Sequence, residues 1–563
     1  MRGDIMKNAM IIVLLFAAVS AAFAQPTIEW QKSFGGTNSD DAYSIQETSD
    51  GGYIVAGGSR SSDGDVTGHH SSSHPGIFTR DYWVVKLDSA GNIEWQKSLG
   101  GSENDYAYSI QQTSDGGFVV AGFSYSNDGD VTGHHGIPGD SLDYWIVKLN
   151  SIGNIEWQKS LGGSNNDWAN SIQQTVDGGY IVAGRSNSND GDVTGHHGIT
   201  GYPDYWIVKL NTTGNIEWQK SLGGSGWDVA NSIQQTGDDG FIVAGYSTSN
   251  DGDVTGNHGS FDYWVVKLNG SGSIEWQKSL GGSDSDYAHS IQQTSDGGFI
   301  VAGRGHSNNG DATGNHGSSD FWVVKLNSSG NIEWQKSLGG IDYEEAYSIQ
   351  QTVDGGYIVA GRSSSNDGDV TGNHGESDYW VVKLNSTGNI EWQKSLGGSD
   401  YEVAYSIQQT SDGVFIVAGY SHSNDGDVTG HHGHTSWSYT DYWIAKLSPQ
   451  DGISENSVPE KFDITAFPNP FNSSVTISLS VIPGLTRNPE IEIFDVNGRM
   501  VAEIPANNPV GAYGIRPGNG STPLTPSVRE LIWQPADNLG SGVYLVRARF
   551  GACEISHRIV YLK

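Results

Sequence analysis

The amino-acid sequence predicts an all-β protein, a seven-bladed β-propeller with four-stranded blades that is followed by a small C-terminal β-sandwich. The first observation behind this fold class is a tryptophan that recurs seven times, at intervals of 58 to 65 residues. Self-similarity with such a period is typical of propellers, solenoids and arrays. The recurring tryptophans, each inside a copy of Ile-Glu-Trp-Gln-Lys, are Trp30, Trp95, Trp157, Trp218, Trp276, Trp334 and Trp392.

The second observation is that each repeat contains four strand-like runs separated by turn residues. The third run of the sixth repeat alternates strictly, with Trp380, Val382 and Leu384 on one face. Short turn signals separate the first two runs and the last two, and a longer connection joins the second to the third. Four antiparallel strands in seven repeats indicate a propeller; an open β-solenoid, whose repeats are usually shorter, is the alternative. The runs of the sixth repeat are residues 346–352, 356–361, 378–384 and 389–395.

The third observation is the way in which the chain enters and leaves the repeats. It enters on the Ile-Glu-Trp-Gln-Lys strand at residues 28–33 and leaves on a strand of the third type at residues 441–447. If Ile-Glu-Trp-Gln-Lys is the outer strand of a blade, its first copy completes the last blade. This arrangement joins the two ends of the ring and leaves no unpaired edge at the seam.

The repeat also resembles a known class. Gly-Gly-Tyr-Ile-Val-Ala-Gly, Asp-Tyr-Trp-Val-Val-Lys-Leu-Asn and Gly-Asn-Ile-Glu-Trp are similar to the delta-60 family of propeller repeats of secreted bacterial proteins, over residues 26–448. The resemblance implies a propeller fold and a surface location, and it supplies no catalytic residue.

Composition and the N-terminus narrow the cellular location and the class of partner. Acidic residues outnumber basic ones 64 to 30, and the net charge of −34 makes nucleic acid an unfavourable partner. Residues 1–24 combine positive charge, an apolar run and Ala22-Phe23-Ala24 before Gln25, the pattern of a secretory signal peptide. We expect export through the inner membrane, no transmembrane segment in the mature chain, and a monomeric propeller.

The long loop of each repeat carries a pair of aspartates in Asn-Asp-Gly-Asp-Val-Thr-Gly. Two interpretations are open: the oxygens of a flexible, glycine-bearing loop suit calcium, whereas Asp and Asn also cap turns through their own backbone. Calcium is the one cofactor that the sequence suggests. The candidate metal ligands are Asp63, Asp65, Asp128, Asp130, Asp190, Asp192, Asp251, Asp253, Asp367, Asp369, Asp425 and Asp427.

Histidines and tryptophans of the loops are the candidates for a ligand-binding face. Aromatic rings beside acidic and amide side chains suit carbohydrate or peptide recognition, and ordinary loop packing is the alternative for both residue types. The selected residues are Trp168, Trp227, Trp437, His135, His197 and His432.

A further acid precedes the first strand of every repeat, and we expect it to tie the incoming loop to backbone N–H groups. These acids are Asp40, Asp105, Asp167, Asp228, Asp286, Glu344 and Glu402.

Composition changes after the last repeat. Residues 449–460 read as a linker, and residues 461–563 contain short alternating strands that indicate an immunoglobulin-like β-sandwich. Phe-Pro-Asn-Pro at 467–470, Asp-Val-Asn-Gly-Arg at 495–499 and Gly-Val-Tyr-Leu-Val at 542–546 resemble the C-terminal sorting domain of the type IX secretion system. The resemblance implies the type IX machinery as a partner, and release from the cell or attachment to its outer surface.

These observations favour a binding or adhesion module with a carbohydrate or protein ligand. An enzyme needs unlike groups placed asymmetrically, and near-identical repeats offer the same groups seven times. We therefore select no catalytic residue. The alternatives are a secreted polysaccharide-acting enzyme of the sialidase or lyase kind, and a calcium-stiffened structural protein of the surface.

Overall fold

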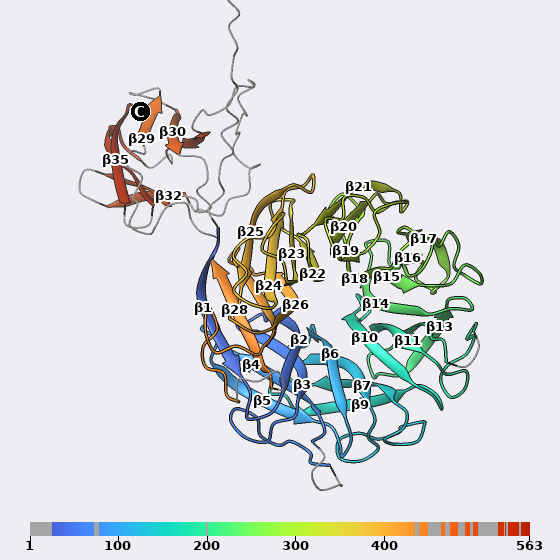
Figure 1. The fold of residues 1–563 in the computed structure, drawn as a ribbon. Helices are drawn as coiled ribbons and strands as arrows, with labels where there is room; N and C mark the ends of the chain where they lie inside the picture. Colours follow the sequence, from blue (N-terminus) through green and yellow to red (C-terminus); the bar gives the residue numbers. More distant parts are fainter. Residues whose placement is uncertain are drawn as a thin grey trace, which may run out of the picture. The chain divides into compact units, whose positions relative to one another are not determined.

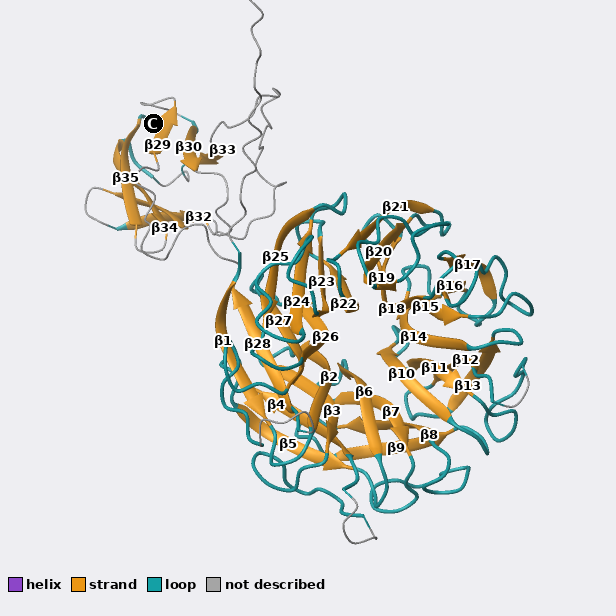
Figure 2. Ribbon diagram, in the orientation of Figure 1, coloured by secondary structure: helices purple, strands orange, loops and turns teal. Residues whose placement is uncertain are grey.

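A computed structural model describes the repeats at residues 25–72, 78–198, 201–433 and 439–448. The chain divides into two compact units, Met1–Pro449 and Gln450–Lys563. The described residues form β-strands and no helix (Figure 2), which confirms the predicted all-β class for them. The predicted signal peptide lies outside the described residues. In the second unit the structure describes residues 463–467, 473–481, 490–495, 499–504, 527–533, 535, 539–550 and 553–563.

The first unit consists of seven four-stranded antiparallel sheets, which follow one another around a central axis (Figure 1). We number the sheets from one to seven in chain order of their inner strands. The inner strands are β2 (Asp40–Glu47), β6 (Asp105–Gln112), β10 (Asp167–Gln174), β14 (Asp228–Gln235), β18 (Asp286–Gln293), β22 (Glu344–Gln351) and β26 (Glu402–Gln409). The second strands are β3 (Tyr53–Ser59), β7 (Phe118–Ser124), β11 (Tyr180–Ser186), β15 (Phe241–Ser247), β19 (Phe299–Gly305), β23 (Tyr357–Ser363) and β27 (Phe415–Ser421).

The outer strand of the seventh sheet comes from the N-terminal end of the repeats, as the sequence predicts. It pairs with the third strand of that sheet from Thr27↔Ser448 to Phe34↔Tyr442. The third strands are β4 (Asp81–Leu87), β8 (Asp143–Leu149), β12 (Asp204–Leu210), β16 (Asp262–Leu268), β20 (Asp320–Leu326), β24 (Asp378–Leu384) and β28 (Asp441–Ser448). The outer strands are β5 (Ile93–Leu99), β9 (Ile155–Leu161), β13 (Ile216–Leu222), β17 (Ile274–Leu280), β21 (Ile332–Leu338), β25 (Ile390–Leu396) and β1 (Thr27–Phe34).

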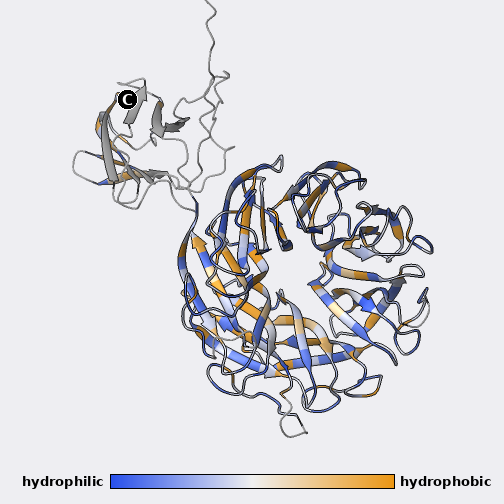
Figure 3. Cartoon of the chain, in the orientation of Figure 1, coloured by the Kyte–Doolittle hydropathy of each residue, from blue (hydrophilic) through white to orange (hydrophobic). Residues whose placement is uncertain are grey.

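The core of this unit is divided into seven clusters, each between two neighbouring sheets. Apolar residues follow the strands (Figure 3), and the tryptophan of every third strand is fully buried. In the first two sheets, the Tyr82 ring lies 4.5 Å from the Trp145 ring, and the Tyr82 hydroxyl donates to the Trp145 carbonyl at 2.8 Å. Six of the seven sheet pairs repeat this contact. The seventh has Phe321 in place of the tyrosine, packed on Trp380 without a hydroxyl.

This exception predicts that Phe321→Tyr stabilises the protein. Gly361 offers the space beside Trp380 that Gly303 offers to the Tyr263 hydroxyl. We expect the free energy of unfolding to rise by about 0.5 to 1.5 kcal/mol, the usual net value of a hydrogen bond. The matched change Tyr263→Phe should lower it by a similar amount. Urea unfolding measures both, and a Phe321→Tyr protein less stable than the parent would contradict the prediction.

Side chains, rather than backbone pairing, join neighbouring inner strands. The Ile110 N–H donates to Ser44 Oγ at 3.2 Å, and the Gln112 N–H donates to Gln46 Oε1 at 2.6 Å. Equivalent bonds join all seven inner strands, including the first to the seventh. The repeated Ser-Ile-Gln motif thus satisfies two edge N–H groups of each inner strand.

The second unit contains two antiparallel sheets in its described part. One has the order β29-β30-β33 and the other β32-β31-β34-β35, and Val475, Ile493, Val546 and Ile559 are buried. The predicted β-sandwich stays a prediction. The strands are β29 (Asp463–Phe467), β30 (Val475–Val481), β31 (Glu490–Asp495), β32 (Met500–Ile504), β33 (Ser527–Trp533), β34 (Gly542–Phe550) and β35 (Cys553–Tyr561).

Candidate functional site

The aspartate pairs of the long loops accept hydrogen bonds from the loop that precedes the inner strand of the same sheet. In the second sheet, Asp128 accepts from the Ser102 N–H at 2.7 Å and Asp130 from the Gly100 N–H at 3.3 Å. These contacts fit the turn-capping interpretation. Among the described residues, no three His, Cys, Asp or Glu side chains are grouped to hold a metal ion, and calcium binding stays a prediction. The equivalent acceptors are Asp63, Asp190, Asp251, Asp367 and Asp425 at the first position, and Asp65, Asp192, Asp253, Asp369 and Asp427 at the second.

The acids that begin the inner strands are buried and bind the incoming loop. The Gly101 N–H donates to Asp105 Oδ2 at 2.8 Å, and equivalent bonds exist in all seven sheets. Burial raises the pKa of Asp40 and of Asp167 to about 7. The predicted structural role of these acids is therefore confirmed.

The loop histidines connect neighbouring sheets. His135 Nδ1 lies 2.8 Å from Asp143 Oδ2 of its own sheet, and its Nε2 lies 3.5 Å from Asp192 Oδ2 of the next sheet. The hydrogen bond to Asp143 raises the pKa of His135. His197 bridges Asp204 and Asp253 in the same way, and His432 bridges Asp441 and Asp65 across the seam. These contacts fit the packing alternative, and a ligand-binding role for the histidines stays a prediction.

The selected tryptophans have different surroundings. Trp168, on β10, lies under the Arg185 guanidinium, whose central carbon is 3.8 Å from the centre of the tryptophan ring. Trp227 is 38% exposed and meets Tyr202 edge-on at 6.0 Å. Trp437 lies outside the described residues. The structure thus places Trp168 beside a cation and leaves Trp227 on the surface.

The sheets differ most strongly at one cross-strand pair, which sequence reasoning missed. This pair joins the second residue of the inner strand to the sixth residue of the second strand. Apart from the fourth residue of the inner strands, which is Tyr, Asn or His, the other positions are similar in all seven sheets, so the aligned repeats contained this signal. The pairs, from the first sheet to the seventh, are Asp41/Gly58, Tyr106/Phe123, Trp168/Arg185, Val229/Tyr246, Tyr287/Arg304, Glu345/Arg362 and Val403/Tyr420.

Four arginines occupy or adjoin these pairs, and we call Arg80, Arg185, Arg304 and Arg362 the arginine centre. Arg80 belongs to it because its side chain covers Gly58, where other sheets carry a large residue. Contacts run from sheet to sheet through the aromatic rings between the arginines. The contacting pairs are Arg80–Tyr106, Tyr106–Phe123, Phe123–Trp168, Trp168–Arg185, Tyr246–Tyr287, Tyr287–Arg304 and Arg362–Tyr343.

Two carboxylates lie within the arginine centre, and both are paired. Asp41 forms an ion pair with Arg80. Glu345 lies 3.2 Å from Arg304 and 3.0 Å from Arg362, and accepts a 2.6 Å hydrogen bond from the Tyr347 hydroxyl. His289 Nε2 is 3.0 Å from the same carboxylate. Burial acts to raise the pKa of Glu345, but the hydrogen bond and charge of His289 and the charge of Arg304 hold it well below its usual range.

Arg185 differs from the other three arginines because no carboxylate among the described residues pairs with it. Its guanidinium contacts the face of Trp168, and its Nε, like that of the other three arginines, is buried without a hydrogen-bond partner among the described residues. Burial lowers the pKa of this guanidinium. A partly exposed cation without a counter-ion is a favourable place for an anionic group of a ligand.

Comparison with known proteins bears on the second unit. Residues 465–511 match the secretion system C-terminal sorting domain. This match supports export of the chain through the type IX secretion system, to the cell surface or beyond, and interaction with that machinery.

The chain is also 29% identical over 140 residues to the regulatory protein FlaEY of Caulobacter vibrioides, a stretch that spans 24% of this chain and 14% of that protein. Across the described residues, no helix has the length and apolar character that a membrane crossing requires.

Proposed function

We propose that this exported protein is a seven-bladed β-propeller that resembles delta-60 repeats, and that it acts as a non-catalytic binding module. Its ligand is an extracellular glycan or protein that carries negative charge, and the arginine centre binds it. The observation that carries the proposal is Arg185, which is partly exposed, stacked on Trp168 and, within the described part of the chain, without a carboxylate partner.

The charge distribution supports an acidic ligand. The whole chain has a net charge of −34, yet the four guanidinium groups of the arginine centre meet two carboxylates, Asp41 and Glu345. Guanidinium groups bind carboxylates and sulfates through paired N–H donors, and aromatic rings stack on the apolar faces of sugars. Trp168, Tyr106 and Tyr287 supply such rings next to the arginines.

A secreted polysaccharide-acting enzyme is the second candidate. It is favoured by one observation, the 2.6 Å contact between the Tyr347 hydroxyl and the Glu345 carboxylate amid unlike groups. Against it, a general acid needs a raised pKa, and the cations around Glu345 lower its pKa. Glu345 is also buried, 4% exposed, which keeps it from a substrate.

The test is a glycan-array screen of the full-length protein and its Arg185→Ala variant, in calcium and again in chelator. We expect binding to glycans that carry carboxylate or sulfate, and at least a tenfold weaker affinity for the variant, since removal of a stacked arginine at the centre of a site has large effects. Lys220→Ala, which removes one positive charge from the outer strand of the same sheet, is the matched control and should bind as the parent does.

The arms of this screen separate the alternatives. Equal binding by the parent and Arg185→Ala would contradict the proposed site. Loss of binding in chelator would support the calcium prediction, and binding that ignores chelator would disfavour it. Release of shortened glycan from the array would favour the enzyme. Binding to no glycan would direct the search to acidic protein ligands or to a structural role.

A further inference from the structure

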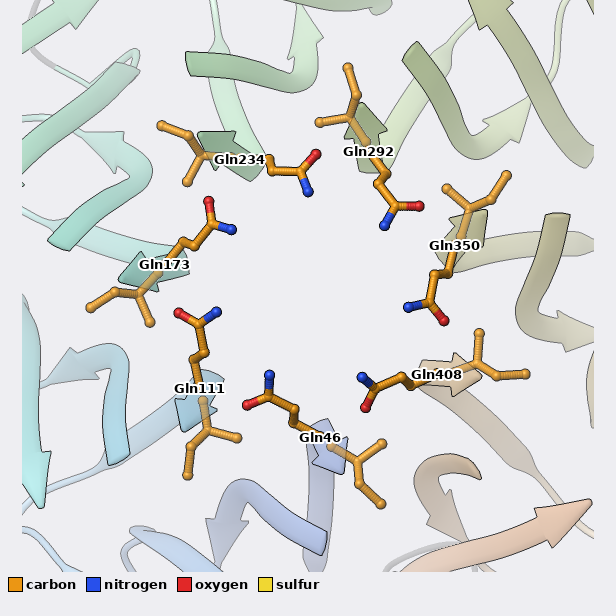
Figure 4. A pocket seen from close by; sticks show the side chains of 14 residues that line it. Gln46, Gln111, Gln173, Gln234, Gln292, Gln350 and Gln408 are labelled. Carbon is orange, nitrogen blue, oxygen red and sulfur yellow. The ribbon is translucent and has the colours of Figure 1, made fainter. Parts of the chain in front are cut away.

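A channel on the axis of the ring is lined by one Ile-Gln pair from each inner strand (Figure 4). Its cavity volume is about 250 Å³. The seven glutamine side chains point into the channel from all sides, and the isoleucines form an apolar wall behind them. The seven glutamines, which we call the axial glutamines, are Gln46, Gln111, Gln173, Gln234, Gln292, Gln350 and Gln408.

The orientation of each axial amide is fixed by the hydrogen bond of its oxygen. Gln111 Oε1, for example, accepts from the Gln174 N–H of the next sheet at 2.6 Å. A backbone N–H can be satisfied by the amide oxygen and not by the amide nitrogen, so the NH₂ group must face the channel. All seven axial glutamines make this bond, at 2.6 to 2.8 Å.

The channel is therefore lined by hydrogen-bond donors. Among the described residues, no acceptor is bonded to the Nε2 atom of any axial glutamine, and no charged side chain lines the cavity. In each turn that follows an inner strand, one aspartate is paired with a lysine; Asp50, for example, lies 3.0 Å from Lys86. Seven convergent NH₂ groups in a partly apolar channel suit a group that is rich in acceptors.

The neighbouring position of the same motif provides an internal comparison. The residue after each axial glutamine also uses its side-chain oxygen as an acceptor: Gln112 Oε1 accepts from the Ser49 N–H at 2.8 Å. In the first sheet this residue is Glu47, whose carboxylate accepts from the Ser411 N–H at 2.7 Å. A carboxylate therefore serves the inter-sheet bond equally well, yet all seven axial positions retain the NH₂ group.

We propose that the axial glutamines form a binding site for an oxyanion, namely a carboxylate, sulfate or phosphate group. The anion accepts hydrogen bonds from several Nε2 atoms at once and sits on the axis of the ring. This site is distinct from the arginine centre. Arg185, Arg304 and Arg362 lie on second strands, opposite the second residue of the inner strands. The axial glutamines are the seventh residue of the inner strands, as Gln46 is on β2. The proposal does not rest on the proposed function.

The test uses selenate as a heavy-atom probe with the full-length protein. We expect saturable selenate binding by calorimetry at 0.1 M ionic strength, and an anomalous scattering peak on the axis in crystals. Gln111→Glu with Gln292→Glu keeps two inter-sheet acceptors but replaces two NH₂ groups by charged oxygens. Selenate affinity should fall at least tenfold in this double variant. The matched control is Gln112→Glu with Gln293→Glu, which makes the same chemical change outside the channel and should bind as the parent does.

Two outcomes would overturn the proposal: no selenate binding by the parent, or equal affinity in the axial variant and the parent. Competition experiments in an Arg185→Ala background, which weakens the arginine centre, identify the source of the anion. Displacement of selenate by polygalacturonate would assign the site to a carboxylate borne on a polymer. Displacement by acetate and phosphate alone would assign it to a free ion, and both results agree with an oxyanion site.

Discussion

Removal of β1 is expected to open the ring and to cost more stability than any point substitution. A chain that starts at Gly35 loses the strand that pairs along β28, the burial of Phe34, and the 2.8 Å bond from Trp443 Nε1 to Gln31 Oε1. Each buried apolar side chain contributes about 1.5 to 3 kcal/mol and each hydrogen bond about 1 kcal/mol. The loss should therefore exceed about 5 kcal/mol, and thermal unfolding monitored by circular dichroism would detect it.

The same deletion should also cause association. β28 becomes an exposed edge with unpaired N–H and C=O groups, which recruit other strands. Sedimentation should then show oligomers whose proportion rises with protein concentration. A chain that starts at Thr27, and so retains β1, is the matched control. If both chains melted alike and remained monomeric, the closure of the seventh sheet would contribute nothing to stability.

The architecture of the repeats could be predicted because it depends on local signals that recur. The Asp378–Leu384 strand was predicted with its observed bounds, since alternation and flanking turns define it from both sides. The exchange of β1 into the seventh sheet follows from the order of strand types alone. By contrast, the hydrogen-bonding role of Ser-Ile-Gln depends on the distance between neighbouring sheets, which no single repeat contains.

The arginine centre could not be predicted in the same way. Sequence reasoning followed the longest loops, because loops commonly carry function. The residues that differ between repeats instead lie within strands or, for Arg80, directly before one. Among the residues at and around the arginine centre, Trp168 is the one that sequence reasoning selected. Only the ring brings Tyr287, Arg304 and Glu345 from two sheets into contact. Aligning the repeats would have shown where they differ, but not that these positions converge.

Glu345→Ala is expected to destabilise the protein by about 3 to 5 kcal/mol. The substitution leaves Arg304, Arg362 and His289 next to one another with no carboxylate between them. Removing one partner of a buried ion pair costs this much because the remaining charges are uncompensated. Denaturant unfolding at pH 7 measures the effect. Glu376→Ala, which removes an exposed acid from a loop of the same sheet, should change stability by less than about 0.5 kcal/mol.

The contribution of Glu345 should disappear in acid. Its pKa is lower in the folded state than in the unfolded chain, so the stabilisation is fully present above the unfolded value and is lost as the pH falls. The difference between the parent and Glu345→Gln, which cannot titrate, should therefore shrink as the pH is lowered from 6 towards 3. The pKa of Asp40 is raised in the folded protein, so its protonation makes the folded state more stable as the pH falls. This contribution is the same in the parent and in Glu345→Gln, and it cancels in their difference. A difference that stayed constant with pH would mean that folding leaves the pKa of Glu345 unchanged.

Ligand binding by Glu345→Gln distinguishes an ionic support from a catalytic acid. The amide still accepts a hydrogen bond, but it no longer neutralises Arg304 and Arg362, so both guanidinium groups become available to a ligand. Affinity for an acidic glycan should therefore rise or stay unchanged, because the charge of the arginine centre becomes more positive. An enzyme that used Glu345 would bind its substrate and lose turnover instead. Weaker binding of acidic glycans by a folded Glu345→Gln protein would contradict the assignment of the arginine centre as an anion-binding site.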